Sequence, residues 1–124
     1  MPYESRSPVY DTAGYWDTYV KFLYYGSEKG KAEQDIRIFN KPGDAYGFLI
    51  DAAYFIDRKN SIEFFLSAVI HCNSDEIFND DKYEYNTIGL PFMKNLGRVI
   101  YEYERTRVRK YQPVLSSMFF DYGH

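Results

Sequence analysis

Residues 61–73 read SIEFFLSAVIHCN, which is the clearest alternating pattern in the chain. One set of alternate positions is apolar throughout: Ile62, Phe64, Leu66, Ala68, Ile70 and Cys72. The other set mixes polar and apolar side chains. Because successive side chains of a β-strand point to opposite faces, residues 61–73 are predicted to form a strand with one face on a core and the other partly covered.

Two further strand patterns precede this one, joined by short connections. Residues 35–41 alternate and are predicted to end as a strand at Pro42-Gly43-Asp44. Residues 47–57 form the second pattern. In it the following residues share a face: Phe48, Ile50, Ala52, Tyr54 and Ile56. The polar sequence Asp57-Arg58-Lys59-Asn60 has the length of a hairpin turn. Connections this short require antiparallel pairing.

Helical patterns flank the three strands. Residues 14–25 place apolar side chains at helical spacing, and Gly26 is suited to end that helix. A longer helix is predicted over residues 82–107, after Asn79-Asp80-Asp81, whose side chains suit an N-cap. Pro91 lies inside that pattern, so the helix either kinks there or begins there.

The predicted fold class is therefore α+β: a three-stranded antiparallel sheet packed by a long C-terminal helix and preceded by a shorter helix. The chain has 124 residues, enough for one small domain. Residues 1–13 carry two prolines and no periodicity and are predicted to be a flexible arm. Residues 14–108 would form the domain and residues 109–124 a tail.

The composition narrows the functional classes. With 45% hydrophobic and 27% charged residues the chain should fold, and its net charge of -3 gives no argument for binding nucleic acid. The basic cluster over residues 105–110 is interpreted as a solvated helix end rather than a binding patch. No apolar run approaches the ~20 residues of a membrane span. Residues 1–9 lack a signal-peptide h-region. That leaves open a cytosolic protein or a chain that begins downstream of its natural start.

The sequence RIFNKPG at residues 37–43 resembles the Lys-Thr/Ser-Gly motif on the third strand of serine β-lactamases and penicillin-binding proteins. A turn, a strand with Gly47-Phe48-Leu49, a polar hairpin, an apolar strand and a terminal helix follow it. This is the order of elements in that family's C-terminal half, and it covers residues 14–104. The resemblance implies a partial β-lactamase-like fold. It also implies a bacterial parent hydrolase of the periplasm or cell envelope.

The resemblance also implies roles for three residues. Lys41 would place a positive charge beside the nucleophile and the substrate carboxylate. Gly43 would let substrate lie against the strand edge, and the backbone N–H of Asp44 would complete the oxyanion hole. The parent's substrates would be peptidoglycan-like or β-lactam-like small molecules, with no cofactor or metal. Pro42 departs from the motif because it has neither a hydroxyl nor an N–H, although an edge strand tolerates proline.

The family's other catalytic motifs are missing. No serine has a lysine three residues later, no Ser-x-Asn or Tyr-x-Asn is present, and about forty residues precede Lys41. We therefore expect a C-terminal portion of a serine hydrolase that is inactive alone. It would be completed at the exposed edge of strand 61–73 by a missing N-terminal half or by a second copy. The alternatives are a non-catalytic binding or assembly domain, and a different small enzyme using surface carboxylates.

Other chemistry-bearing residues favour structural interpretations. His71 and Cys72 are adjacent on a strand and cannot form a dyad, so Cys72 is predicted in the core and His71 half-exposed. The acidic residues between 75 and 81 do not have the spacing of a calcium loop. A binding platform remains open for four tyrosines, which otherwise belong to the edge of the core: Tyr24, Tyr25, Tyr46 and Tyr54.

Overall fold

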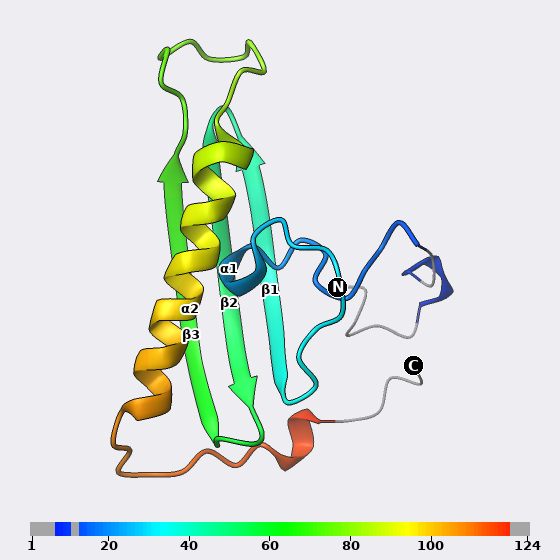
Figure 1. Ribbon diagram of the computed structural model, residues 1–124, viewed down its shortest axis with the longest axis vertical. Helices are drawn as coiled ribbons and strands as arrows, with labels where there is room; N and C mark the ends of the chain where they lie inside the picture. Colours follow the sequence, from blue (N-terminus) through cyan, green and yellow to red (C-terminus); the bar gives the residue numbers. More distant parts are fainter. Residues whose placement is uncertain (1–6, 11–12, 120–124) are drawn as a thin grey trace.

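The computed structural model describes residues 7–10 and 13–119 (Figure 1). A short turn of 3-10 helix, η1 (Pro8–Tyr10), and a short helix, α1 (Phe22–Tyr25), come first. Three strands follow: β1 (Ile36–Ala45), β2 (Phe48–Asp57) and β3 (Ile62–His71). The chain ends with the π-helical turn η2 (Tyr85–Gly89), the long helix α2 (Leu90–Thr106) and η3 (Ser116–Met118). Part of the predicted arm, residues 1–13, lies outside the described residues. The end of the predicted tail, residues 120–124, also lies outside them.

The strands form one antiparallel sheet in the order β1-β2-β3, which confirms the predicted α+β class. α1 and α2 cover the same face of the sheet (Figure 1), here called the inner face; the opposite one is the outer face. On β3 the apolar set from Ile62 to Ile70 points inward, as predicted, while the residues between are exposed. On β2 the set that includes Phe48 and Ile50 does share a face, but it is the outer one.

The first strand was predicted to end at Pro42, and this is wrong: β1 continues to Ala45. The ammonium of Lys21 donates to the carbonyl of Ile38 at 2.6 Å. That carbonyl therefore points to the free edge of β1 rather than to β2. Backbone groups along an antiparallel strand alternate in direction, so Pro42, four residues further, also directs its backbone to that edge. Its missing N–H costs no ladder bond, and the strand passes through it.

The helix predicted over residues 14–25 is reduced to α1, and the rest of that range is turns. Even within α1 the dihedrals of Leu23 and Tyr24 are non-helical. Contacts with the sheet override the helical pattern: the Leu23 N–H donates to the Asp51 carboxylate at 3.0 Å instead of to a helical carbonyl. Gly26 ends α1 as predicted, with φ 58 and its N–H on the Phe22 carbonyl.

The long helix begins at Leu90, with Pro91 in its first turn, so the proline marks a start rather than a kink. The predicted cap is wrong: Gly89 occupies the N-cap position, and the Asp80 carboxylate instead accepts the nearby N–H of Lys82. α2 ends at Thr106, and the tail then passes under one end of the sheet (Figure 1). Among the described residues no helix is both long and apolar enough to cross a membrane.

Candidate functional site

Lys41 was predicted to end the first strand, but it lies in the middle of β1, paired with Ala52. Its side chain is exposed on the outer face, in register with Ala52 on β2 and Ser67 on β3. Within the described part of the chain, no hydrogen bond or ion pair engages its ammonium. The charge is therefore available to a ligand on the outer face or at the free edge of β1.

Gly43 and Asp44 present different groups beside that lysine. Gly43 pairs with Ile50, and a side chain added at Gly43 would meet the Ile50 Cγ2 at 3.3 Å. Asp44 lies an even number of residues after Ile38 on the same strand, so its backbone N–H also points to the free edge of β1. The structure thus brings an exposed cation, a residue without a side chain and an outward N–H together on one edge strand. These are the three predicted site residues.

Behind this strand, on the inner face, lies a group of buried polar residues that the sequence analysis did not predict. Asp51 is 0% exposed, and Lys21 is 1% exposed. The Asp51 carboxylate accepts hydrogen bonds from the Leu23 N–H and from the Asn40 side-chain amide, at 2.9 Å for the nearer oxygen. Asn40 also donates to the Val20 carbonyl at 2.9 Å. These bonds fasten residues 20–23 to β1 and β2 behind Lys41.

Burial raises the pKa of Asp51, and the donated hydrogen bonds together with the nearby Lys21 oppose that shift. A buried carboxyl with a raised pKa is a common signature of acid–base catalysis, but this one faces the core and has its donors supplied by the fold. We interpret the cluster as a support for β1. An aspartate at an inward position of an apolar strand was the sequence signal that could have found it.

The outer face carries a shallow groove next to the Lys41 row. Three rings cross the sheet in register and form one side of it: Phe39, Tyr54 and Phe65. The Tyr54 ring stacks on Phe65 at 4.5 Å and on Phe39 at 6.3 Å. The small side chains of Ala52 and Ser67 leave the hollow, which has a volume of about 380 Å³. Such a surface binds flat apolar groups.

The remaining candidates from the sequence fall into structural roles. Cys72 is 3% exposed, as predicted, and burial raises the pKa of its thiol, which makes it a poor nucleophile. His71 points to the outer face and stacks on Phe48 at 4.1 Å. Tyr24 and Tyr25 are core residues, so the four tyrosines do not form one platform. Within residues 7–10 and 13–119, no group of three or more His, Cys, Asp or Glu side chains is arranged to hold a metal.

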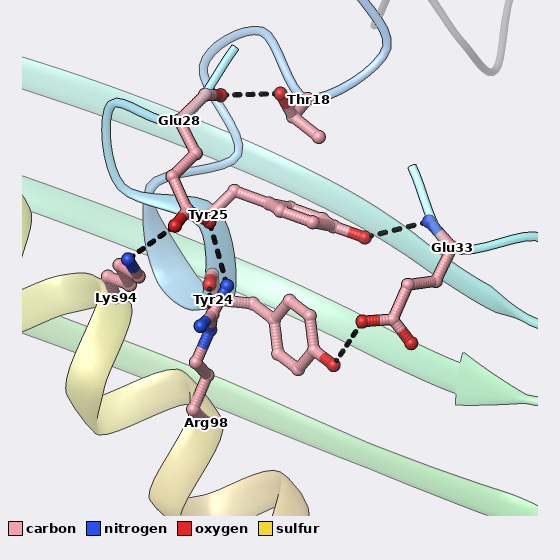
Figure 2. Close-up of polar contacts among 7 residues, drawn as sticks. All are labelled: Thr18, Tyr24, Tyr25, Glu28, Glu33, Lys94 and Arg98. Atoms are coloured by element: carbon pink, nitrogen blue, oxygen red, sulfur yellow. Dashed lines mark hydrogen bonds and ion pairs between the residues drawn. The ribbon is translucent and has the colours of Figure 1, made fainter. Parts of the chain in front are cut away.

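A network of polar contacts holds the segment around α1 against α2 (Figure 2). The Arg98 guanidinium donates to the Tyr24 carbonyl at 3.0 Å and to the Glu28 carboxylate at 2.7 Å, and Lys94 pairs with the same carboxylate (Figure 2). The Tyr24 hydroxyl donates to the Glu33 carboxylate at 2.8 Å. The Tyr25 hydroxyl accepts from the Glu33 N–H at 3.0 Å (Figure 2). The network therefore positions the chain that supports β1, and it gives Tyr24 and Tyr25 structural roles.

No protein-family model, no curated protein and no solved structure matches this chain.

Proposed function

We propose that this chain is the C-terminal portion of a β-lactamase-like or D-Ala-D-Ala peptidase-like serine hydrolase, with the Lys-x-Gly strand but without the nucleophile. The observation that supports the proposal is the arrangement on β1. Lys41 is exposed in mid-strand, and two and three residues later come Gly43 and the outward N–H of Asp44. Alone, the chain would bind a substrate fragment but would not react with it.

Each residue would then have a defined task. A substrate in extended conformation would lie along the free edge of β1, as a strand adds to a sheet. The Lys41 ammonium would attract its carboxylate, and the Asp44 N–H would donate to its carbonyl oxygen. Pro42 would offer only its carbonyl at that edge, in place of the hydroxyl that the family motif provides. We therefore expect weak binding to this chain alone.

A titration with a peptide ending in D-Ala-D-Ala, followed by backbone amide shifts, tests the proposal. The shifts should change over residues 41–45, and Lys41→Met should weaken binding by about tenfold, which corresponds to ~1.4 kcal/mol. Lys59→Met is the matched control, because Lys59 is an exposed lysine in the β2–β3 turn. Shift changes confined to other surfaces, or equal effects of the two substitutions, would contradict the assignment.

Mass spectrometry of the intact chain after incubation with a penicillin tests the second half of the proposal. No covalent adduct is expected, because no serine in this sequence has a lysine three residues later. An adduct that survives denaturation would mean that the chain contains its own activated nucleophile.

The alternative is a non-catalytic binding or assembly domain, and the aromatic groove on the outer face favours it. In that case the peptide would leave residues 41–45 unchanged. An aromatic ligand would instead shift the resonances of Tyr54 and Phe65, which line the groove.

A further inference from the structure

We propose that two copies of this chain pair through β3 in an antiparallel two-fold dimer with Ser67 opposite Ser67 of the second copy. The inference does not depend on the proposed hydrolase ancestry. It rests on the direction of the backbone groups of β3, on the side chains that this register would bring together, and on the charges at the two ends of the sheet.

β3 is an edge strand whose only neighbour among the described residues is β2. The Cys72 N–H, just after β3, donates to the Gly47 carbonyl, on the β2 side. Even-numbered residues of β3 therefore direct their backbone groups toward β2, and odd-numbered residues direct theirs to the free edge. Residues 63, 65, 67, 69 and 71 thus offer a row of N–H and C=O groups to another strand, and this is the arrangement that invites edge pairing.

The odd-numbered side chains of β3 are self-complementary about Ser67. In the antiparallel register centred there, Phe65 lies opposite Val69 of the second copy, and both are largely exposed in the single chain, at 79% and 59%. Aromatic residues paired with β-branched residues are among the favourable cross-strand combinations. On the inner face the same register places Leu66 opposite Ala68, a large side chain against a small one.

The same register places a carboxylate opposite an imidazole at both ends of β3. Glu63 lies opposite His71 of the second copy, and both side chains are exposed on the outer face. The Tyr54 hydroxyl holds the Glu63 carboxylate there through a hydrogen bond of 3.0 Å, and stacking on Phe48 holds the His71 ring. If the register is centred on residue 66 or 68 instead, Glu63 faces Val69 or His71 faces Phe65. The pairing of Glu63 with His71 is then lost.

Charges beyond the strand also favour antiparallel self-pairing. The acidic loop, residues 73–84, contains five carboxylates and one lysine and lies at one end of the sheet (Figure 1). The basic end, residues 102–110, contains four cations and two carboxylates and lies at the other (Figure 1). A two-fold axis through Ser67 places the acidic loop of each copy beside the basic end of the other, twice in one dimer.

Sedimentation of the full chain across a micromolar concentration range, with substitutions at the edge, tests the dimer. Ser67 is exposed, so Ser67→Lys should leave the fold intact while setting two ammonium groups against each other at the axis; the dissociation constant should rise ~10-fold or more. Ala52→Lys is the matched control, because Ala52 is exposed on the same face but lies on the central strand. A dimer broken by Ala52→Lys and not by Ser67→Lys would be a stacking of outer faces and would overturn the proposal.

Charge reversal and hydrogen exchange fix the register. Glu63→Lys and His71→Glu should each weaken the dimer, and the double variant should restore it. In the dimer the amides of Phe65, Ser67 and Val69 should become protected, whereas those of Phe64, Leu66 and Ala68 are protected in either state. A chain that stays monomeric at all concentrations and exchanges its odd-numbered amides rapidly would overturn the proposal, as would a double variant no tighter than the single ones.

Discussion

The two faces of the sheet are built from the same three strands but differ in what covers them. The inner face is closed by α1 and α2, and it buries charged groups as completely as apolar ones: Asp51 is as inaccessible as Phe55. The outer face leaves Phe65 and Val69 open. The difference shows that burial in this protein follows the contacts of a position rather than its hydrophobicity. Substitutions on the two faces should therefore differ sharply in their effects.

The largest effect is expected at Gly97, where α2 touches the backbone of α1. A Cβ at this position would lie 2.4 Å from the Tyr24 nitrogen and 3.0 Å from the Leu23 carbonyl carbon. Because both are backbone atoms, relief requires moving α1 from α2, and Gly97→Ala should lower the free energy of unfolding by about 3 kcal/mol. Urea denaturation measures this. Asn95→Ala, on an exposed part of α2, is the control, and similar losses in both variants would contradict the packing argument.

The next largest effect is expected at Asp51. Asp51→Ala leaves the Leu23 N–H without its acceptor and the buried Lys21 without a neighbouring negative charge. Removing one partner of a buried charged cluster costs about 3 kcal/mol in the free energy of unfolding. Asp44→Ala, an exposed aspartate on β1, should change it by less than about 0.5 kcal/mol. Equal stability of the two variants would show that the cluster does not support β1.

These residues also show how far the sequence predicts the structure. The alternation of β2 and β3 was sufficient for the strands and their pairing, because period-2 patterns depend only on local geometry. The helix over residues 14–25 failed because Asp51, distant in sequence, captures the Leu23 N–H. Lys41, Gly43 and Asp44 were proposed as site residues from a local motif, which needs no contact between strands. The Lys21–Asp51 support, the groove at Tyr54 and the extension of β1 through Pro42 depend on contacts between strands, which local patterns do not contain.

A smaller effect on the free energy of unfolding is expected from pH, and it has opposite signs at Asp57 and Asp51. Burial would raise the pKa of Asp57, but hydrogen bonds from Asn60 and from the Tyr101 hydroxyl outweigh it, and the pKa is lowered. Asp57 therefore contributes stability above its unfolded pKa of about 3.9, and this contribution is lost as the pH falls through the folded value. The pKa of Asp51 is raised. Its contribution is therefore present below the unfolded pKa and is lost as the pH rises through the folded value.

Carboxyl titrations followed by NMR should give an Asp57 midpoint below and an Asp51 midpoint above the unfolded value. Asp57→Asn should reduce the loss of stability as the pH falls. Asp51→Asn should remove the loss of stability that accompanies ionisation of Asp51 as the pH rises. Two raised midpoints would mean that burial outweighs the donors at both positions, and two lowered midpoints would mean that the donors outweigh burial at both.

The smallest effect on stability is expected at Phe65, although its ring is as large as that of buried Phe55. Phe65→Ala removes a ring that is 79% exposed and that, among the described residues, stacks on Tyr54 alone, so the free energy of unfolding should fall by about 0.5 kcal/mol. Phe55 is 1% exposed and stacks on Phe64 at 4.6 Å, so Phe55→Ala should cost about 3 kcal/mol. Denaturation at low protein concentration isolates this difference from any pairing of β3. If Phe65→Ala were as destabilising as Phe55→Ala there, the outer face would be a second core already covered by this chain. At high concentration, where two copies would pair, the cost of Phe65→Ala should grow, because the same ring then loses its cross-strand contact with Val69 of the second copy as well.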